Sequence, residues 1–368
     1  MMSAARIAPL VSSNGNGHAH AAAAIAALDR LQSLLESFAG KHVLVVGDCM
    51  LDEYVWGKAT RISPEAPVMV VEHVDTTYAA GGASNVAANV VAMDGRASIV
   101  ALVGDDAMGE TLRDELGRQG VSHAGLVVQP GRPTTVKTRI VAHHQQVLRV
   151  DRENRVPVPD EIAVRLVGRV QEELEAASAV LLSDYSKGVL TRRVVQEIIH
   201  LAQAAGKPVF ANPKPSSLDY YAGLTFVSLN QSEAEAATGL SLADFDAADQ
   251  LGERLLGLCR AEAAAVTLGG RGLVLFERGH SWRHLPVVPL EVYDPCGCGD
   301  SAISAATLAR AAGATWEEAA TLANLAGNAK VRKLGVVPVN RAEIEHVWKM
   351  SHAADGGMAP REIHLRHP

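Results

Sequence analysis

The sequence predicts an α/β fold in which a mostly parallel sheet is flanked by helices and a small antiparallel sheet stands outside it. Short, wholly apolar segments alternate with helix-length amphipathic segments, which is typical of a parallel sheet covered on both faces. Two stretches, 54–74 and 134–150, instead alternate and are rich in β-branched residues, which indicates paired strands without helices. The composition agrees, since 48% of the 368 residues are apolar and only 4% are aromatic.

The predicted elements follow one another in a regular order. The folded part begins with an amphipathic helix at 21–38, whose apolar face carries Ile25, Leu28, Leu31, Leu35 and Phe38. The strands predicted for the main sheet are 43–46, 99–103, 180–183, 209–211, 226–229 and 265–268. The predicted helices are 81–93, 105–117, 160–177, 191–205, 231–238, 247–262, 301–312 and 317–330.

Residues 21–350 are expected to form one folded domain between two loosely ordered ends. Residues 1–20 are small and polar and contain several Gly and Asn, which predicts a disordered segment. The alternative is a signal peptide, but the apolar piece at 7–11 is short and is interrupted by Pro9. Residues 351–368, with a Gly pair and scattered His, are expected to form a flexible tail.

Charge and cysteine content argue against several classes of protein. The 34 Lys and Arg against 41 Asp and Glu leave a net charge of −7, which argues against a nucleic-acid partner. No run of about 18 apolar residues is present, so we expect no membrane partner. Four Cys do not make a disulfide scaffold, and the spacing of Cys296 and Cys298 is not that of a zinc site. An anionic ligand would therefore need locally placed Lys, Arg or backbone N–H groups.

Polar residues follow the predicted strands of the main sheet. Ligands of an open α/β sheet bind at the carboxyl ends of its strands, so these residues bear most directly on function. One polar residue there is ordinarily a helix cap, but several at one edge indicate a binding crevice. They are Asp48, Asp52, Asp184, Asn212, Lys214, Asn230, Glu233 and Thr267.

The most informative segment is Asp294–Asp300, with the sequence DPCGCGD, which precedes a helix of small residues. Gly297 and Gly299 let the backbone bend closely around a ligand, and the start of the helix presents unpaired N–H groups that form an anion site. A carboxylate at 300 would repel phosphate, but it suits a base that deprotonates a hydroxyl attacking a phosphoryl group. Two alternatives stay open: Asp300 is a helix cap, or 297–302 is a loose dinucleotide fingerprint.

A second glycine-rich segment, Gly81–Asn89, opens a helix. Gly81 and Gly82 allow a backbone turn close to a ligand, and Asn85 can both donate and accept hydrogen bonds, as sugar hydroxyls require. The alternative is an ordinary glycine turn with Asn85 on the surface of the helix.

These two segments resemble the two signatures of the ribokinase/PfkB carbohydrate kinase family. Two further motifs agree with that family in the same order along the chain: Asn230–Glu233 matches its N-x-x-E motif, and Thr267–Gly272 matches its T-x-G-x-x-G nucleotide loop. The resemblance covers the chain from about Val43 to Val347. It implies a ribokinase-like fold with a small antiparallel β lid, and an enzyme that uses ATP and Mg²⁺.

Four other segments are similar to the heptose-7-phosphate kinases of this family: 46–52, 60–67, 145–151 and 182–188. This resemblance implies ATP-dependent phosphorylation of the anomeric hydroxyl of D-glycero-β-D-manno-heptose 7-phosphate to the 1,7-bisphosphate, in ADP-heptose biosynthesis for the lipopolysaccharide core. Such kinases are often fused to an adenylyltransferase domain, and the chain is too short for one, so we expect a kinase alone. The alternatives are another sugar or sugar-phosphate kinase of the family, or a non-catalytic sugar-phosphate sensor on the same fold.

Three positions depart from the family pattern. Cys298 stands where Ala is usual, Cys296 stands where Thr is frequent, and Asn212 replaces the Asp that precedes Pro-Lys. Both Cys are small, so we expect activity to survive, with sensitivity to thiol reagents. The missing charge at 212 argues against a metal role there.

The resemblance and the chemistry of the residues together imply catalytic and sugar-binding roles. Asp300 is the predicted general base, and the N–H groups of Gly297, Cys298 and Gly299 are predicted to stabilise the transferring phosphoryl group. The predicted sugar-binding residues are Asp48, Asp52, Gly81, Gly82 and Asn85.

Three basic residues are candidates for phosphate contacts. All three are candidates for the distal phosphate of the substrate or the phosphates of ATP, with Arg61 and Lys187 assigned to the substrate and Lys214 to ATP. The alternative for all three is ordinary surface charge.

A further set is implied for the nucleotide and its cations. Glu233 is predicted to act on Mg²⁺ through water, because Mg²⁺ gives up its waters reluctantly, and the alternative is a first-turn helix carboxylate. Asp294 is placed to help bind a monovalent cation such as K⁺. The residues predicted to line ATP are Lys214, Asn230, Glu233, Thr267, Gly269, Gly272, Asn324 and Asn328, and surface Asn is the alternative for the last two.

Assembly and location follow from the same resemblance. Relatives pair through such lids, and a small exposed sheet has one face to bury and edges to protect, so we expect a homodimer. We expect a cytoplasmic protein whose small-molecule partners are a sugar phosphate and ATP.

Overall fold

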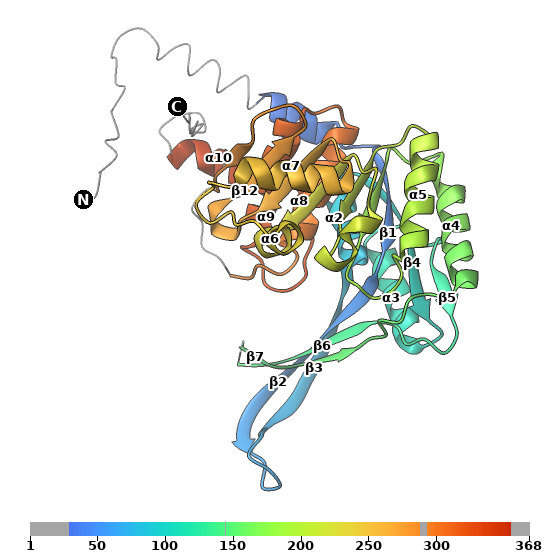
Figure 1. Ribbon diagram of the computed structural model, residues 1–368. Helices are drawn as coiled ribbons and strands as arrows, with labels where there is room; N and C mark the ends of the chain where they lie inside the picture. The colour runs from blue at the N-terminus through green and yellow to red at the C-terminus, as the bar shows by residue number, and fades with distance from the viewer. Residues whose placement is uncertain (1–28, 144, 288–292, 355–368) are drawn as a thin grey trace.

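The main sheet of the computed structural model, which describes residues 29–143, 145–287 and 293–354, runs through the centre of the molecule (Figure 1). Within those residues it has nine strands in the order β13-β12-β11-β10-β9-β8-β1-β4-β5. The pairs from β11 to β5 are parallel, and β12 and β13 are antiparallel additions at one edge. The strands are β1 His42–Gly47, β4 Arg96–Gly104, β5 Val127–Gln129, β8 Ala179–Ser183, β9 Val209–Asn212, β10 Phe226–Asn230, β11 Ala263–Thr267, β12 Leu273–Glu277 and β13 Arg283–Leu285.

Helices cover both faces of this sheet. Successive residues of β1 enter opposite cores: Val43 and Val45 pack with α2, α8 and α9, whereas Leu44 and Val46 pack with α4, α5 and α7. Every residue of β1 is buried, which explains why the central strands are wholly apolar. The helices are α2 Ala83–Ala92, α3 Ala107–Arg118, α4 Asp160–Leu174, α5 Arg192–Ala204, α6 Gln231–Thr238, α7 Ala248–Cys259, α8 Cys298–Ala311, α9 Trp316–Lys330 and α10 Arg341–Ala354.

A second sheet, which we call the lid, projects from the body (Figure 1). It consists of β2 Cys49–Ile62, β3 Met69–Gly82, β6 Val136–Ala142 and β7 Gln145–Arg152, in the order β3-β2-β6-β7. The pairs β2–β3 and β6–β7 are antiparallel hairpins, while the central pair β2–β6 is parallel. That central pair is parallel because β2 and β6 both leave the body in the same direction.

The predicted architecture is confirmed, with differences at its margins. β5, β12, β13 and α10 are not among the predicted elements, and each lies at an edge of the main sheet or near the end of the described chain. Residues 29–36 are helical, and Leu31, Leu35 and Phe38 are buried as expected, whereas 21–28 lie outside the described residues. Residues 351–354 continue α10, so the predicted tail boundary differs, and 1–20 and 355–368 lie outside the described residues. Among the described helices none has the length and apolar character that crossing a bilayer demands.

Candidate functional site

The carboxyl ends of five neighbouring parallel strands meet at one edge of the main sheet. Asp48 follows β1, Asp184 follows β8, and Asn212, Asn230 and Thr267 end β9, β10 and β11. The structure therefore brings together the strand-end residues that the sequence pattern marks. Asp300 is bonded to side chains beside this edge, and the lid begins there, so the sheet, the lid and α8 meet at one place.

Gly297 forms the turn that starts α8. Its φ of 81° lies in the left-handed region, and it occupies the N-cap position without a side-chain cap. A Cβ at this position would lie 3.1 Å from Nδ2 of Asn85, so a larger residue would press on that amide. The N–H of Cys298 donates to the carbonyl oxygen of Pro295 over 3.3 Å, and the other N–H groups at the start of α8 have no acceptor within the helix, so an anion can accept from them.

The carboxylate of Asp300 is held by side chains from two distant parts of the chain. Nδ2 of Asn85 donates to Oδ2 over 2.7 Å, and the hydroxyl of Tyr185 donates to Oδ1. Only 6% of Asp300 is exposed. Since its carboxylate accepts from side chains of other elements and not from the backbone of its own helix, the interpretation of Asp300 as a simple cap is not supported.

Burial sets the acidity of Asp300. Loss of solvent raises its pKa to about 6, even though the hydrogen bonds from Tyr185 and Asn85 and the charge of Lys214 act in the opposite direction. A carboxylate with a pKa near the working pH is a more effective proton acceptor than an ordinary exposed Asp. The geometry and the electrostatics both suit a general base.

Asp52 lies where β2 passes from the body into the lid. Its carboxylate forms an ion pair with Arg139 of β6, and only 2% of the residue is exposed. Burial raises the pKa of Asp52, while Arg139 lowers it. A Cβ on Gly81 would lie 2.1 Å from Oδ2 of Asp52, so glycine is required for the carboxylate to occupy its place. Gly82 is equally constrained, with a φ of 59° and a Cβ position 2.4 Å from the carbonyl oxygen of Asp48.

Asp48 has a different environment from the one predicted. Its carboxylate accepts from the backbone N–H groups of Tyr185 (2.9 Å), Lys187 (3.0 Å) and Val189 (3.2 Å). It is 1% exposed, and burial raises its pKa to about 6. In this structure Asp48 therefore holds the loop after β8 in place, and its predicted contact with sugar hydroxyls stays a prediction.

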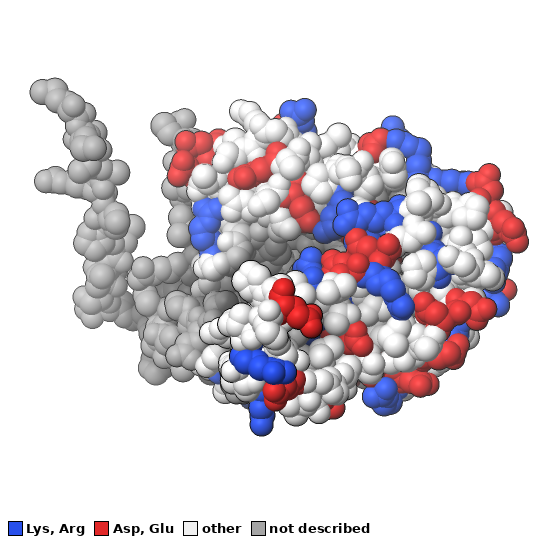
Figure 2. All heavy atoms as spheres, turned by 90° about the horizontal axis from the view of Figure 1, so that it is seen from below, with Lys and Arg blue, Asp and Glu red and all other residues white. Residues whose placement is uncertain are grey.

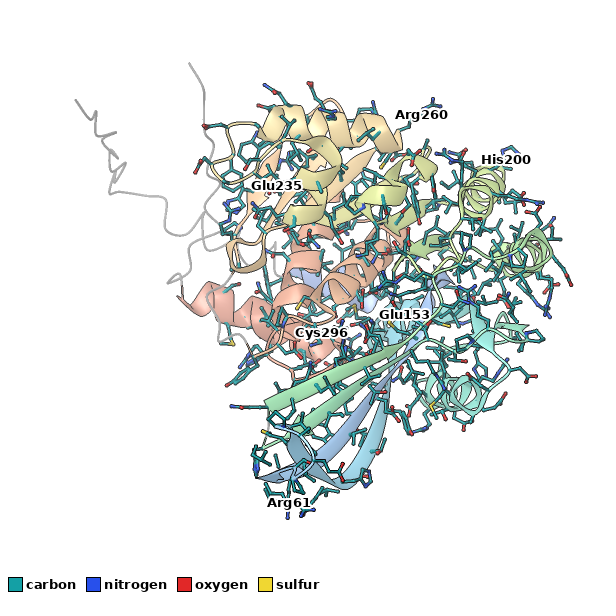
Figure 3. All side chains as sticks on the ribbon, turned by 60° about the horizontal axis from the view of Figure 1, so that its bottom comes forward. Arg61, Glu153, His200, Glu235, Arg260 and Cys296 are labelled. Atoms are coloured by element: carbon teal, nitrogen blue, oxygen red, sulfur yellow. The ribbon has the colours of Figure 1, made fainter. Side chains whose placement is uncertain are left out.

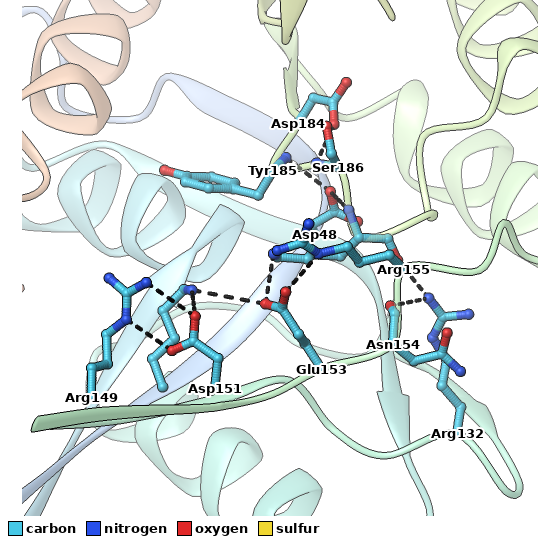
Figure 4. Close-up of polar contacts among 12 residues, drawn as sticks. Asp48, Arg132, Arg149, Asp151, Glu153, Asn154, Arg155, Asp184, Tyr185 and Ser186 are labelled. Atoms are coloured by element: carbon cyan, nitrogen blue, oxygen red, sulfur yellow. Dashed lines mark hydrogen bonds and ion pairs between the residues drawn. The ribbon is translucent and has the colours of Figure 1, made fainter. Parts of the chain in front are cut away.

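A cluster of opposite charges joins this loop to the lid (Figure 4). Nζ of Lys187 lies 2.6 Å from Oε2 of Glu153, Arg155 lies 2.7 Å from the same carboxylate, and Nζ of Lys137 lies 3.9 Å away. Lys137 also pairs with Asp151 at 3.1 Å. The face seen in Figure 2 shows basic and acidic side chains gathered side by side. Lys187, Arg155 and Lys137 each have an acidic partner within the protein, so an anionic ligand that binds them would compete with Glu153.

Arg61 is not brought to the other predicted residues. It is exposed near the outer end of β2, at the tip of the lid, whereas Cys296 and Glu153 lie beside the body (Figure 3). The prediction that Arg61 binds the same phosphate as Lys187 is not supported within one chain. The sequence could not reveal this, because the length of the lid strands depends on how they pair.

The nucleotide-side motifs surround a separate hollow. A cavity of about 430 Å³ is lined by Asn230, Glu233, Thr267 and Gly269, together with Pro215, Gln231, Ser232 and Leu268. Such a volume lies in the range of small-molecule sites. Four of the residues predicted to line a nucleotide therefore share one pocket.

Asn230 and Glu233 have local partners as well. Asn230 caps α6, and Glu233 completes a capping box by accepting from the N–H of Asn230. The other carboxylate oxygen of Glu233 accepts from Nζ of Lys214 over 2.7 Å. The alternative of a first-turn helix carboxylate therefore describes part of what Glu233 does.

The other nucleotide-side residues differ in their surroundings. A Cβ on Gly272 would lie 2.0 Å from the carbonyl oxygen of Leu285, so this glycine lets β12 pack against β13. Asn324 donates to the carbonyl oxygens of Leu285 and Pro286. Asn328 is 7% exposed, and its Nδ2 has no partner among the described residues, which leaves a buried donor for a ligand or water.

Asp294 ties two loops together. Oδ1 accepts from the N–H of Cys296 (2.9 Å) and Oδ2 from the N–H of Gly335 (2.8 Å).

Burial raises the pKa of Cys298 to about 11 and also raises that of Cys296. Both thiols are therefore protonated near neutral pH, which weighs against the expected sensitivity to thiol reagents.

The oxygen atoms at this edge fit Mg²⁺ that arrives with a nucleotide. In the described part of the chain no group of three or more His, Cys, Asp or Glu is arranged to hold a metal by itself. Oδ1 of Asn212 is buried and accepts no hydrogen bond from the described residues. Amide oxygen and water are ligands that Mg²⁺ accepts, so position 212 keeps a ligand atom although it lacks a charge.

Tyr185, Arg139 and Glu153 were not predicted as site residues. Tyr185 lies inside the 182–188 segment, in which Asp184 and Lys187 were predicted to have functional roles. The signal that could have identified Tyr185 is an aromatic residue directly after a polar strand end. Arg139 and Glu153 become visible only when the lid strands are paired, because the register that puts Lys137 opposite Asp52 is a property of the folded sheet.

Comparisons with known proteins agree with this geometry. The model of the pfkB family carbohydrate kinases matches residues 41–343. The Bifunctional protein HldE of Caulobacter vibrioides is 43% identical over 317 residues, which cover 86% of this chain and 65% of that protein. The protein of the same name from Desulfatibacillum aliphaticivorans is 39% identical over 308 residues, covering 84% of this chain and 63% of that protein. The chain thus spans about two thirds of the length of these relatives.

Solved structures share the fold. The ribokinase of Arabidopsis thaliana, complexed with ribose and ATP, aligns with a TM-score of 0.66 and 21% identity, covering 84% of this chain and 99% of that one. Phosphofructokinase-2 of Escherichia coli, in complex with fructose-6-phosphate, aligns with a TM-score of 0.69 and 18% identity, covering 84% and 98%. With the family model matching most of its length, the chain belongs to the PfkB family of carbohydrate kinases.

Proposed function

We propose that the chain is an ATP-dependent kinase that phosphorylates the anomeric hydroxyl of D-glycero-β-D-manno-heptose 7-phosphate to the 1,7-bisphosphate, as a step in ADP-heptose biosynthesis for the lipopolysaccharide core. The observation that carries the proposal is the buried carboxylate of Asp300, held by Asn85 and Tyr185 at the start of α8. The similarity to the proteins named HldE and the four segments typical of heptose-7-phosphate kinases support this substrate.

In this proposal Asp300 removes the proton of the attacking hydroxyl. The N–H groups of Gly297, Cys298 and Gly299 stabilise the charge on the transferring phosphoryl group, which develops little covalent contact with the protein. Gly297 is suited to this because its left-handed turn exposes the start of α8. The chemistry is thus divided between one base and a cradle of backbone donors.

ATP is assigned to the cavity lined by Asn230, Thr267 and Gly269, with Lys214 at its border and Asn324, Asn328 and Gly272 farther along. Mg²⁺ bound with ATP would neutralise phosphate charge, held through water by Glu233 and by the free amide oxygen of Asn212. Asp294 would help to hold a monovalent cation such as K⁺ beside the cradle. The carboxylate of Asp294 and the loops that it joins support this assignment.

The sugar is assigned to the junction between the body and the lid, with Asp52, Asn85, Gly81 and Gly82 around its hydroxyls. Its distal phosphate would displace Glu153 from Lys187, with Lys137 and Arg155 nearby. Arg61 is too far along the lid to share this contact within one chain, and it would act there from a second copy.

The proposal includes a cytoplasmic homodimer that associates through the lid. Exposed apolar side chains on the lid support this, among them Ile62 (62% exposed), Val74 (61%) and Leu148 (53%). Such a concentration of apolar surface on a projecting sheet is typical of an interface.

Two other functions compete with this one. Another PfkB kinase, such as a ribokinase or a fructose-phosphate kinase, would use the same base and cradle with a different sugar. A non-catalytic sensor of sugar phosphates would keep the fold without turnover. The intact arrangement of Asp300 and Gly297 favours an enzyme over the sensor.

A kinase assay over a panel of sugars tests the proposal. The panel contains heptose 7-phosphate, free heptose, ribose, fructose and fructose 6-phosphate, each with ATP and Mg²⁺. We expect strong turnover of heptose 7-phosphate and little of the unphosphorylated sugars. Equal kcat/KM for free heptose would contradict the phosphate site, and preferred turnover of fructose 6-phosphate would transfer the assignment to the other kinase. No turnover of any sugar would favour the sensor.

A further inference from the structure

Tyr185 contacts the oxygen of the Asp300 carboxylate that Asn85 does not contact. Its hydroxyl donates to Oδ1, while Asn85 donates to Oδ2. The two donors together fix the plane of the carboxylate, because each oxygen has its own partner. The family signatures that include Asp300 and Asn85 do not include Tyr185, which comes from the loop after β8.

The position of Tyr185 is itself fixed on two sides. Its backbone N–H donates to the buried carboxylate of Asp48 over 2.9 Å. The ammonium group of Lys214 lies 5.4 Å from the centre of its ring, at a distance typical of a cation–π contact. Since Lys214 also pairs with Glu233, the ring stands between the nucleotide-side residues and the base.

We propose that Tyr185 is a positioning residue for the catalytic base: its hydroxyl holds the Asp300 carboxylate in the orientation in which it accepts the proton of the sugar hydroxyl. This inference rests on the proposed role of Asp300. The hydroxyl stays a donor throughout, because burial and the neighbouring Asp300 charge raise the pKa of Tyr185 well above its ordinary value.

The hydrogen bond favours the ionised form of Asp300. Burial raises the pKa of Asp300, and the bond from Tyr185 is the largest effect that lowers it again. Without the hydroxyl the carboxylate would take up its proton at higher pH and would be protonated over more of the working range. The variant would then lose activity at low pH, where Asp300 is protonated, and retain more of it at high pH, where Asp300 is ionised.

Other charged and titratable groups face Asp300 and stay the same when Tyr185 is changed. Lys214 after β9 lowers the pKa of Asp300, and Asp52 of β2, paired with Arg139, raises it. Asp300 in turn acts on the thiols in its own loop, and α9 contributes a buried ammonium beside that loop. The groups that act on Asp300, or on which it acts, are Lys214, Asp52, Cys296 and Cys298, and the next charges around them are Arg139, Asp294 and Lys330.

The test is the pH dependence of kcat/KM for Tyr185→Phe. Phe keeps the ring and its packing and removes one hydroxyl, so the variant is expected to fold. A hydrogen bond to a charged group is strong enough to shift the acidic limb by about one pH unit upward, from its wild-type position near pH 6. Activity should be about tenfold lower below the limb, and on the plateau toward pH 9 it should stay below the wild-type value because the carboxylate is no longer held in its orientation.

The chain offers a matched control in Tyr221→Phe. The hydroxyl of Tyr221 likewise donates to a carboxylate, that of Asp184, over 2.9 Å, although Tyr221 is fully buried and Tyr185 is only partly buried. Loss of the Tyr221 hydroxyl should lower thermal stability at least as much and leave the limb unmoved. Ionisation of the substrate phosphate affects all variants alike, so it cancels in the comparison.

Measurement of Asp300→Asn in the same series separates the two assignments. If this variant loses about two to four decades of kcat at every pH and the limb moves in Tyr185→Phe alone, the inference is supported. If Asp300→Asn shows that loss and the limb of Tyr185→Phe stays in place, or moves equally in Tyr221→Phe, the positioning role is overturned and the base is retained. If Asp300→Asn keeps its activity, the proposed base falls, and the role of Tyr185 falls with it.

Discussion

At position 300 a carboxylate is buried where it would normally be solvated. Its pKa of about 6 results from burial opposed by two hydrogen bonds and one nearby ammonium group. Below that pH the side chain is protonated and cannot accept a proton, so kcat is expected to fall as the pH drops through 6. Near neutral pH it is ionised and ready to act.

Replacing Asp300 by Asn is the direct test of its role. Asn has nearly the same size but cannot take the proton of the hydroxyl. We expect a folded protein with a melting temperature close to that of the wild type and unchanged affinities for ATP and sugar phosphate. Its kcat should be lower by about two to four decades, as measured by steady-state kinetics.

The alternative, in which Asp300 is only a helix cap, predicts the opposite result. If Asp300 only supports the start of α8, the Asn variant would keep more than about a tenth of the wild-type kcat. Thermal unfolding on the same preparation shows whether any loss of rate reflects misfolding.

The sequence located part of this site but not its supports. Asp300, Asn85 and the glycines were visible because short motifs keep them together in the chain. Tyr185 could not be assigned to Asp300, because they are 115 residues apart and their contact depends on how β8 and α8 are arranged. Asp48 was predicted to contact sugar hydroxyls because a carboxylate accepts hydrogen bonds, and its bonds to the loop after β8 could not be predicted because they depend on the folded loop.

Among the elements, the loop after β8 contacts the chain at the end of the lid through an ion pair. Lys187 from this loop pairs with Glu153, which follows β7 directly. The contact is largely buried, since the two side chains are 10% and 11% exposed. A phosphate ester that replaced the carboxylate of Glu153 would therefore form a strong contact.

Lys187→Ala tests whether this loop holds the sugar phosphate. We expect the KM for the sugar phosphate to rise by roughly tenfold or more, because a charge-assisted contact is removed. The KM for ATP should change much less. Steady-state kinetics with each substrate varied in turn provides the measurement.

A matched lysine serves as the control. Lys207 precedes β9, so it lies at the amino ends of the parallel strands, away from the site, and donates to the carbonyl oxygen of Glu175. Lys207→Ala should leave both constants unchanged. If Lys187→Ala raises the KM for ATP more than the KM for the sugar phosphate, Lys187 binds the nucleotide and not the sugar phosphate.

Most elements were predictable because their periodicity is strong. The parallel strands are short and wholly apolar, and the helices between them have clear apolar faces. β5 and β13 have three residues each, too few to show any period, and β12 pairs antiparallel at an edge where an apolar run alone does not give direction. The parallel pairing of β2 with β6 joins two segments far apart in the chain, so local pattern cannot predict it.

At the scale of the whole molecule, the lid gives the chain an exposed apolar surface away from its core. Leu148 on β7 is 53% exposed and Val74 on β3 is 61% exposed. We expect a homodimer at micromolar concentration, because association would bury this surface and protect the strand edges. Light scattering measures the mass directly.

A charge on the lid should weaken the dimer. Leu148→Lys is expected to shift the mass toward that of one chain, whereas Val164→Lys, at a residue of α4 with a similar exposure of 55%, should not. A wild-type protein that scatters as a monomer at this concentration would remove the idea, as would equal effects of the two substitutions.

The length of β2 determines how far the tip of the lid lies from the body. Its first residues, among them Asp52, are buried in the body, while its last residues are exposed at the tip, and its 14 residues extend over about 46 Å. A rotation of the lid about the buried end of β2, where Asp52 lies, would therefore move the exposed tip much farther than it moves Asp52. A partner that holds the tip would accordingly restrict rotation at the buried end of the strand.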